Sequence, residues 1–383
     1  MRVLIDYRPA LRRRSGAGEY THQLVRALAS AFRSNGANHS RERLELAVFS
    51  SSWRDRLADM RGLGDVTVVD RRVPVRVLNF AWHRLGWPPA EMLAGGAFDV
   101  THSSHPLILP ARHAAHVVTI HDLDFLAHPE RTRAEIRRDY PVLARAHARR
   151  AHRILVPSNF TAAEVARQFD VPHERIAVCP PGAPPWQPRS AIPMDGYTLF
   201  VGTLEPRKNL GALLDAYETL AVQANAGHHA LPRLVIAGQA VEGSRAWLER
   251  IARPPLRDHV RHIGYVEPAR TRELYEGARL LVQPSFEEGF GIPVLEAMTL
   301  GVPVVAARRG SLPEVLGDAG VLVDPDSPND IAAAIDRLLH DDAFAAGCVR
   351  RGLERARAFQ WELTARKVFE VYRQAIEAHA HRH

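Results

Sequence analysis

Short apolar runs alternate along the whole chain with stretches of helical spacing. The runs are nearly continuous in apolar residues, as in parallel strands that are covered on both faces. Between them, apolar residues recur at helical intervals, as Tyr20, Leu24 and Leu28 do within 19–31, which predicts amphipathic helices. The alternation predicts an α/β fold with doubly wound sheets. Strands are predicted at 1–7, 44–49, 65–69, 98–102, 117–120, 154–157, 176–178, 197–201, 234–238, 260–266, 280–283 and 321–324.

A proline-rich stretch at 180–193 divides the pattern, because so many prolines exclude a helix or a central strand. The 383 residues are enough for two cores. We therefore predict an N-terminal Rossmann-like domain at 1–190 and a C-terminal Rossmann-like domain at 191–360. The remainder, 361–383, is predicted to be a helix that packs back on the first domain, aided by Trp361, and a polar tail.

The composition is that of an ordinary globular protein, with 46% hydrophobic and 24% charged residues. The two cysteines, Cys179 and Cys348, form no disulfide framework and favour a reducing compartment. The first residues enter a strand pattern directly, without the apolar region of a signal peptide, and no window is apolar enough for a membrane span. These features predict a cytoplasmic protein.

The net charge of +7 is unevenly distributed. Up to Asp195 there are 28 arginines and no lysine against 19 acidic residues, which gives +9, whereas the remainder has 22 basic and 24 acidic residues, which gives −2. A basic first half suits an anionic partner such as a membrane surface, and a merely soluble arginine-rich surface explains it equally well. The runs at 12–14 and 131–153 belong to this half, and the second is predicted to be a helix. No aromatic-interleaved basic motif or zinc pattern supports nucleic-acid binding.

The stretch 284–304, PSFEEGFGIPVLEAMTLGVPV, combines a strand end, a glycine-containing loop and a short helix. Gly289 and Gly291 allow a close approach of backbone to a ligand, and a helix N-terminus just beyond a strand attracts anions. Glu288 lies in the loop, and Glu296 is expected in the first turn of the helix, where dipole capping alone would explain it. The alternative is that the two carboxylates accept hydrogen bonds from a ligand on either side of a phosphate site.

Two further stretches place candidate functional side chains directly after predicted strands. Residues 201–210, VGTLEPRKNL, hold Arg207 and Lys208 at a helix start, where two cations neutralise a diphosphate. Residues 117–125, VVTIHDLDF, place His121 at the carboxyl end of a strand, the edge that faces a ligand crevice. The simpler explanation of Arg207 and Lys208 is an ordinary surface pair. The simpler explanation of His121 is a core histidine whose hydrogen bonds are satisfied.

The E-x7-E loop, VGTLEPRKNL and VVTIHDLDF resemble, in order and spacing, the motifs of glycosyltransferase family 4, retaining enzymes with the two-domain GT-B fold. This fold has two Rossmann-like domains that face each other across a deep cleft, and a terminal helix that returns to the first domain. The resemblance spans nearly the whole chain. It implies catalysis by His121, Glu288, Arg207 and Lys208. It also implies donor binding by Gly202, Tyr265, Val266, Gly289, Phe290, Gly291, Ile292 and Glu296, and an acceptor or phosphate loop at Gly16 and Gly18.

The resemblance implies transfer of a sugar from a nucleotide diphosphate to an acceptor hydroxyl, with no cofactor and no metal. Asp122 and Asp124 form a D-x-D that is interpreted as accidental, with Asp122 expected to orient the His121 ring. The loops look most like those of bacterial mannosyltransferases of O-antigen or exopolysaccharide synthesis, which implies GDP-mannose and a glycan or polyprenyl-diphosphate-linked acceptor, handled at the inner face of the cell membrane. UDP-sugar users share these motifs, so glucose, galactose or GlcNAc donors stay open.

Other classes of protein fit less well. His102, His105, His113 and His116 invite a metal site, but no Cys or Asp pattern accompanies them, and structural or surface roles are predicted. A sugar-nucleotide 2-epimerase would share the fold and lack the Arg-Lys and E-x7-E pair. A non-catalytic sugar-nucleotide or anion-binding protein should have lost part of the catalytic set, and the whole set is present.

Overall fold

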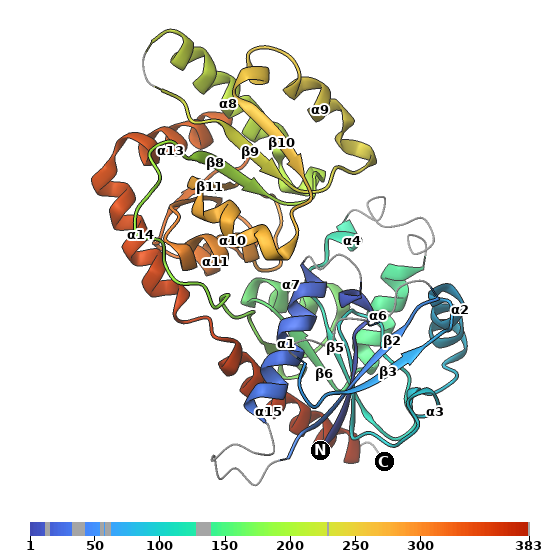
Figure 1. Ribbon diagram of the computed structural model, residues 1–383. Coiled ribbons are helices and arrows are strands. Elements are labelled where there is room, and N and C mark those ends of the chain that lie inside the picture. The colour runs from blue at the N-terminus through green and yellow to red at the C-terminus, as the bar shows by residue number, and fades with distance from the viewer. Residues whose placement is uncertain are drawn as a thin grey trace. The chain divides into compact units, whose positions relative to one another are not determined.

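The computed structural model describes residues 1–11, 16–32, 43–53, 57, 63–127, 139–227 and 230–381. The chain forms two compact units (Figure 1). Unit 1 comprises Met1–Gly182 together with Gln360–His383, and unit 2 comprises Ala183–Phe359. The division falls inside the proline-rich stretch at one end and just before the terminal helix at the other.

Unit 1 contains a parallel seven-stranded sheet in the order β3-β2-β1-β4-β5-β6-β7. Its central strand β1 pairs in parallel with β2 on one side and β4 on the other, so the strand order reverses between β1 and β4. This reversal is the switch point at which doubly wound sheets bind ligands. The strands are β1 (Arg2–Asp6), β2 (Glu45–Ser51), β3 (Thr67–Arg71), β4 (Val100–Ser103), β5 (Ala115–Thr119), β6 (Arg153–Val156) and β7 (Ile176–Val178).

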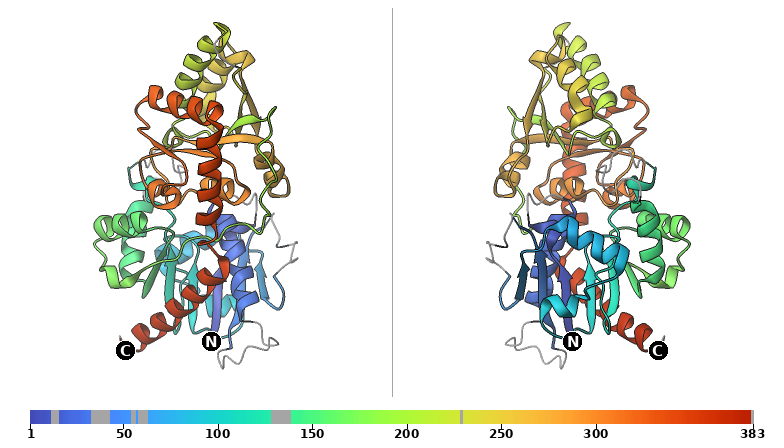
Figure 2. Two further views of the ribbon diagram at one scale, coloured as in Figure 1. Left: turned by 90° about the vertical axis from the view of Figure 1, so that its left-hand side faces the viewer. Right: turned by 90° about the vertical axis from the view of Figure 1, so that its right-hand side faces the viewer.

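Helices cover both faces of this sheet because successive side chains of a strand point to opposite faces. Val3 and Ile5 pack in the core with α1 and α15, which lie side by side (Figures 1 and 2). Leu4 packs in the opposite core with the helices that precede β4. The elements of unit 1 are η1 (Arg8–Ala10), α1 (Ala17–Ala31), α2 (Val75–Phe80), the π-helical η2 (Ala81–Leu85), α3 (Ala90–Ala94), α4 (Asp124–Ala127), α6 (Tyr140–Arg150), α7 (Asn159–Phe169), η4 (His173–Arg175) and α15 (Trp361–Ala380).

The terminal helix α15 is part of the unit-1 core. The Phe369 ring stacks on Phe32 with centroids 4.2 Å apart, and Trp361 lies 5.5 Å from Tyr20. The hydroxyl of Tyr372 bonds to Nδ1 of the fully buried His102 at 2.7 Å. A buried polar pair of this kind fixes the register of the helix against the sheet.

His102 makes the stability of unit 1 sensitive to acid. Burial lowers its pKa from 6.5 to about 3, so the unfolded chain binds the proton first. Stability is therefore complete above pH 6.5 and is lost as the pH falls from 6.5 towards 3. Between pH 7.5 and 5 we expect His102 to account for a loss of about 2 kcal/mol, from 1.36 kcal/mol per pH unit. Chemical denaturation of the wild type and of His102→Gln at both pH values measures this, and equal pH slopes would contradict it.

Unit 2 contains a parallel six-stranded sheet in the order β10-β9-β8-β11-β12-β13, and its order reverses between β8 and β11. Both sheets are doubly wound, as predicted. The strands are β8 (Tyr197–Val201), β9 (Leu234–Ala237), β10 (Val260–Gly264), β11 (Ala278–Gln283), β12 (Val304–Ala307) and β13 (Val321–Val323). The helices are η5 (Pro206–Lys208), α8 (Leu210–Asn225), η6 (Glu242–Ser244), α9 (Arg245–Ile251), η7 (Leu256–Asp258), α10 (Pro268–Glu276), α11 (Ile292–Leu300), α12 (Leu312–Leu316), α13 (Pro328–His340) and α14 (Asp342–Ala356).

The structure corrects one predicted helix boundary. The arginine-rich helix predicted at 131–153 is described only as Tyr140–Arg150, because Arg153 already opens β6 and residues 128–138 lie outside the described part. The run at 12–14 also lies outside it. The C-terminal helices are three: Asp341 caps α14 through its side chain, and residues 357–360 separate α14 from α15.

Candidate active site

The two loops predicted to bind the donor lie together at the carboxyl edge of the unit-2 sheet. One loop, 202–209, follows β8, and the other, 284–291, follows the neighbouring strand β11. The backbone N–H of Phe286 donates to the carbonyl of Arg207 at 2.8 Å and joins them directly. This edge is the switch point of the sheet, where a ligand is expected.

Glu288 is the centre of a buried polar cluster. Its Oε1 accepts a hydrogen bond from Lys208 Nζ at 2.5 Å. Oε1 also accepts from Gln283 Nε2 and Ser285 Oγ, each at 2.8 Å. The second oxygen, Oε2, has a longer contact, 3.4 Å to Arg207 Nη1. Oε1 therefore has a full set of donors, and Oε2 is the oxygen with capacity for a further donor.

The charges of this cluster keep Glu288 ionised. Burial would raise the pKa of its carboxyl group, but the cations Lys208 and Arg207 outweigh burial and lower the pKa to about 2. Arg207 is shared, because its Nε donates to Glu205 Oε2 at 3.0 Å. Two cations thus face carboxylates at a helix start, and this pairing offsets part of the desolvation cost of holding the charges there.

Two side chains outside the predicted set hold the loops around Glu288. Asn209 donates from Nδ2 to the carbonyls of Pro284 and Pro325, at 3.1 and 2.7 Å, and so connects the loops after β8, β11 and β13. Ser311 donates from Oγ to the Glu288 carbonyl at 2.8 Å. The positions of the two predicted loops are therefore fixed by a third and a fourth loop of the same unit.

The sequence prediction missed Gln283, Ser285, Asn209 and Ser311. A weak signal existed for Gln283, a polar residue that ends an otherwise apolar strand. Ser285 and Ser311 carried no such signal, because a serine in a loop is ordinary. Asn209 has a φ of +54°, which only the backbone geometry reveals.

Glu296 lies elsewhere than predicted. Helix α11 begins at Ile292, and its first turn contains no acidic residue, so Glu296 lies in the second turn and does not cap the helix. Its Oε2 accepts a hydrogen bond from the Tyr275 hydroxyl at 2.8 Å. Gly291 precedes the helix with a φ of +101°, and no side chain caps the helix there. The position of Glu296 removes the dipole explanation and leaves its carboxylate one turn behind the helix start.

The remaining predicted donor residues frame the same edge. Phe290 is buried, and its ring centroid lies 5.5 Å from that of Phe359, so its ring belongs to the core. Gly289 precedes it, and Ile292 opens α11. Tyr265 and Val266 follow β10 and are half-buried.

Gly202 lies directly after β8, beside Gly238 at the end of β9. A Cβ on Gly202 would meet the methylene groups of Lys208 at 3.3 Å, so the glycine leaves room for the lysine stem. The structure therefore brings Gly202, Arg207, Lys208 and Glu288 into one cluster.

His121 is a candidate site of unit 1. It follows β5, and its ring lies edge-on to Tyr20 with centroids 5.0 Å apart. Burial lowers its pKa to about 4, although the Asp122 charge and a hydrogen bond with the Ser104 backbone act in the opposite direction, so the ring is neutral near pH 7. Within the described part of the chain, the buried Nε2 has no hydrogen-bond partner. Asp122 Oδ1 accepts from the Asp124 N–H at 3.3 Å, and the role of Asp122 in orienting the His121 ring stays a prediction.

Gly16 and Gly18 occupy the start of α1. Gly16 precedes the helix with a φ of +50°, a conformation that favours glycine. A Cβ on Gly18 would lie 2.6 Å from the carbonyl oxygen of Pro9, so this glycine is required by packing against η1. The structure thus shows why packing requires a glycine at position 18, which the sequence did not indicate.

Three of the four histidines considered for a metal have other partners. His102 bonds to Tyr372 and Thr119, and His116 contacts Thr101 Oγ1 at 3.0 Å. His105 lies 3.1 Å from the buried carboxylate of Asp6. Over the described ranges, no group of three or more His, Cys, Asp or Glu side chains is arranged to hold a metal ion.

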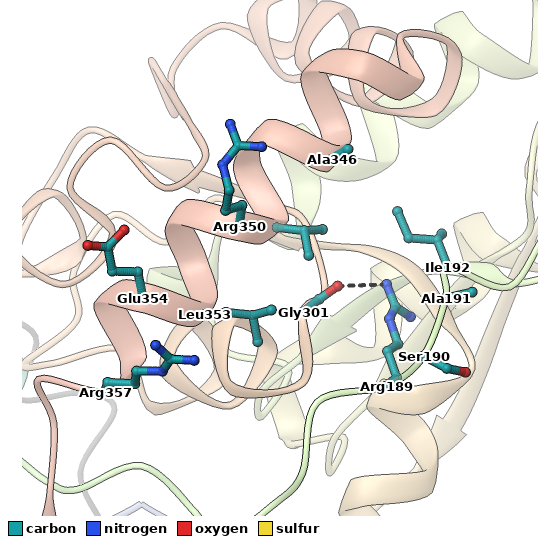
Figure 3. A pocket seen from close by; sticks show the side chains of 11 residues that line it. Arg189, Ser190, Ala191, Ile192, Gly301, Ala346, Arg350, Leu353, Glu354 and Arg357 are labelled. Atoms are coloured by element: carbon teal, nitrogen blue, oxygen red, sulfur yellow. Dashed lines mark hydrogen bonds between the residues drawn. The ribbon is translucent and has the colours of Figure 1, made fainter.

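A separate hollow of unit 2, with a volume of about 500 Å3, lies against α14 (Figure 3). None of the predicted site residues lines it. Arg189 on its wall donates to the Gly301 carbonyl at 3.1 Å and so ties the proline-rich stretch to the end of α11. Burial lowers the pKa of Arg189 to about 10, which still leaves it charged. Its contacts give Arg189 a structural role.

The described helices include none that is long and apolar enough to cross a membrane. Two doubly wound parallel sheets on one chain, with a cation pair and a glycine-opened helix at the switch point of the second, are the features of a GT-B glycosyltransferase. Residues 14–186 match the sequence profile of Glycosyltransferase Family 4, and residues 185–355 match that of Glycosyl transferases group 1.

The chain belongs to this family of glycosyltransferases. It is 31% identical to the O-antigen chain mannosyltransferase B of Escherichia coli over 395 residues, which cover 97% of this chain and 100% of that protein.

Solved structures agree with the fold. Sucrose-phosphate synthase from Thermosynechococcus elongatus has a TM-score of 0.77 at 20% identity and covers 98% of both chains. HepE of Anabaena in complex with UDP and glucose has a TM-score of 0.67 at 18% identity and covers 97% of this chain and 98% of that one. These likenesses confirm the GT-B fold that the sequence predicted.

Ser285 is expected to position Glu288. In Ser285→Ala, Oε1 loses one of three donors, which should cost about 1–2 kcal/mol of stability. The carboxylate also gains freedom to rotate, so kcat for sugar transfer should fall on the order of tenfold. Stopped assays and urea unfolding measure the two effects.

Ser244→Ala is the matched control. Ser244 is also buried in unit 2, and its hydroxyl donates to the Val241 carbonyl at 2.6 Å, away from Glu288. It should lose comparable stability with unchanged kcat. Equal kcat values for the two variants would show that Ser285 has only a structural role.

Proposed function

We propose that the protein is a retaining hexosyltransferase that moves mannose from GDP-mannose to a hydroxyl group of a glycan or polyprenyl-diphosphate-linked saccharide in cell-surface polysaccharide synthesis, without a metal. The observation that carries the reaction class is the buried cluster of Arg207, Lys208 and Glu288 at the switch point of unit 2. The mannose donor is supported by the full-length similarity to the Escherichia coli O-antigen mannosyltransferase.

In the proposed reaction, the bond between the anomeric carbon and the β-phosphate oxygen breaks, and the acceptor oxygen bonds to that carbon on the same face. The acceptor proton passes to the departing phosphate oxygen, and GDP leaves. Negative charge therefore develops on the diphosphate. Arg207, Lys208 and the uncapped start of α11 stabilise it, which is electrostatic catalysis by groups that are already in place.

The carboxylates and His121 bind sugar hydroxyl groups in this proposal. Glu288 accepts through Oε2, the oxygen whose contact among the described residues is the long one with Arg207. Glu296 accepts from the ribose of the nucleotide. His121 is neutral and offers its unpartnered Nε2 to a hydroxyl of the transferred sugar. His121 belongs to unit 1, whereas Glu288 and Glu296 belong to unit 2.

The first test is a panel of thermal shifts and donor hydrolysis with GDP-mannose, UDP-glucose, UDP-galactose and UDP-GlcNAc, all with EDTA present. A ligand at a hundredfold excess over its Kd stabilises the native state by about 2.7 kcal/mol. We expect stabilisation and slow turnover with GDP-mannose, and loss of turnover in Glu288→Ala. A response to one UDP-sugar instead would identify that sugar nucleotide as the donor and leave the proposed reaction class unchanged.

Two outcomes would contradict more than the donor. Binding without turnover would favour a non-catalytic sugar-nucleotide protein. A loss of turnover caused by EDTA, restored by a divalent cation, would contradict the metal-independent reaction.

A further inference from the structure

Unit 1 exposes an unusual group of large apolar side chains between residues 75 and 92. Val77, Phe80, Leu85, Trp87 and Met92 are each 55–67% exposed. Elsewhere in the described part, exposed large apolar side chains are spread over the chain, and isolated ones of this kind are normal. A group of five within one short segment is characteristic of an interaction surface.

The fold holds these side chains outward. Helix α2 continues directly into η2, and the opposite side of this helical segment is anchored by Leu78 and Trp82, both buried. Trp82 Nε1 donates to the Pro88 carbonyl at 2.8 Å, which fixes the turn that carries Trp87. The segment is thus partly core and partly surface, with its buried side anchored by Leu78 and Trp82.

The surroundings of this group are basic. Between residues 71 and 95 there are four arginines and one acidic residue, Glu91, and one of the four arginines, Arg84, forms an ion pair with Asp139. The Glu91 carboxylate is occupied, because Oε1 accepts from the backbone N–H groups of Arg112 and His113 at 2.9 and 3.3 Å. Arg72 and Arg76 are exposed. We define the apolar-basic face as Val77, Phe80, Leu85, Trp87 and Met92 with Arg72 and Arg76.

The charge identifies the partner. Two copies of a basic face repel each other, so self-association through it is disfavoured. Apolar side chains with a tryptophan, flanked by arginines on a short helical segment, match the interface of an anionic bilayer, where apolar groups enter the headgroup boundary and arginines meet lipid phosphate. We propose that the apolar-basic face docks unit 1 onto an anionic membrane surface.

The apolar-basic face lies next to the sheet edge at which α1 starts, which links membrane docking to acceptor binding. Arg8 follows β1 and donates from Nη1 to Asn79 Oδ1 at 2.8 Å, and its guanidinium lies 4.8 Å from the Trp82 ring centre. Arg8 also pairs with the buried carboxylate of Asp6 at 2.6 Å. The helical segment is therefore clamped to the carboxyl edge of β1, the sheet edge at which α1 starts. A lipid-linked acceptor, which rests on the proposed function, would reach that edge directly from the membrane.

The test is sedimentation of the full chain with vesicles of phosphatidylcholine, with and without phosphatidylglycerol, in the absence of nucleotide sugar. We expect binding to the anionic vesicles that weakens with salt. The double variant Phe80→Ser/Leu85→Ser should lower partitioning at least about tenfold, because two exposed apolar side chains are lost. Arg72→Gln/Arg76→Gln should remove most of the preference for phosphatidylglycerol.

The matched control is Val222→Ser/Leu363→Ser, which removes two side chains that are similarly exposed outside the face. It should bind vesicles as the wild type does. Because Phe80 and Leu85 are exposed, thermal melting should show that both double variants are folded. A second readout needs no destabilising change: vesicles should shift the tryptophan emission of the wild type to shorter wavelength, and Trp87→Phe should reduce that shift.

The proposal is overturned if the wild type does not bind anionic vesicles, or if Phe80→Ser/Leu85→Ser binds them as well as the control does. It is also overturned if the wild type forms dimers that the same variant abolishes while vesicle binding stays unchanged. Donor hydrolysis should be equal in the wild type and in Phe80→Ser/Leu85→Ser. A failure of the membrane proposal is therefore distinct from a failure of the proposed transferase activity.

Discussion

Lys208→Met should reduce sugar transfer on the order of 10²–10³-fold, since it removes a preorganised cation from the site where diphosphate charge develops. It should also destabilise unit 2 by about 3 kcal/mol, because Glu288 stays buried with its 2.5 Å partner removed. We take the lower end of the range for broken buried pairs, since Arg207, Gln283 and Ser285 still contact the carboxylate. For a unit of this size the melting temperature should fall by roughly 6–12 °C.

Arg245→Met is the control for an ion pair in the same unit. Arg245 and Glu249 are 2.8 Å apart, but both are exposed, so the change should cost at most about 0.5 kcal/mol and leave kcat unchanged. The double variant Lys208→Met/Glu288→Gln should be more stable than Lys208→Met, because it removes the uncompensated buried charge. If the double variant is less stable by the sum of the single effects, the two side chains are not coupled as described.

Gly238→Ala should prevent unit 2 from folding or cost more than about 4 kcal/mol. Gly238 has a φ of +157°, and a Cβ there would lie 1.8 Å from the carbonyl oxygen of Gly202. The backbones of both glycines are held by neighbouring strands, so no side-chain rotation relieves the clash. Urea unfolding followed by circular dichroism measures the loss, and donor binding at the adjacent loop should disappear with it.

Gly243→Ala provides the contrast. Gly243 lies five residues further along the chain, has no positive φ, and a Cβ there would meet no atom within 4 Å. Its substitution should change the free energy of unfolding by no more than about 0.5 kcal/mol. Comparable stability of the two variants would mean that the backbone between β8 and β9 shifts to accept a side chain.

The architecture could be read from the chain because its cause is local. Apolar runs covered on both faces and glycine or proline after a strand are properties of neighbouring residues. For this reason the strands, the two doubly wound sheets and the loop that contains Glu288 were predictable. The motif spacing also placed Arg207 and Lys208 in the loop after β8, and the structure joins them to Glu288.

Other features depend on contacts between distant segments and had no local signal. Asn209 connects the loops of three strands, and Gly18 is required because Pro9 approaches its backbone. The turn of α11 on which Glu296 lies depends on where the helix starts, which Gly291 sets through a positive φ. Local propensity and tertiary packing together determine where a helix starts, so motif spacing alone placed Glu296 one turn too early.

The sequence by itself determined the two doubly wound sheets, the family and the residue types of the candidate site, because periodicity and motif spacing are carried by neighbouring residues. Only the tertiary structure decided which oxygen of Glu288 has capacity for a ligand and which residues hold that carboxylate in place. It also decided that Phe80 and Trp87 face outward while Trp82 is buried. These outcomes depend on which distant segments cover a side chain, and the hydrophobicity of a residue does not specify its neighbours in space.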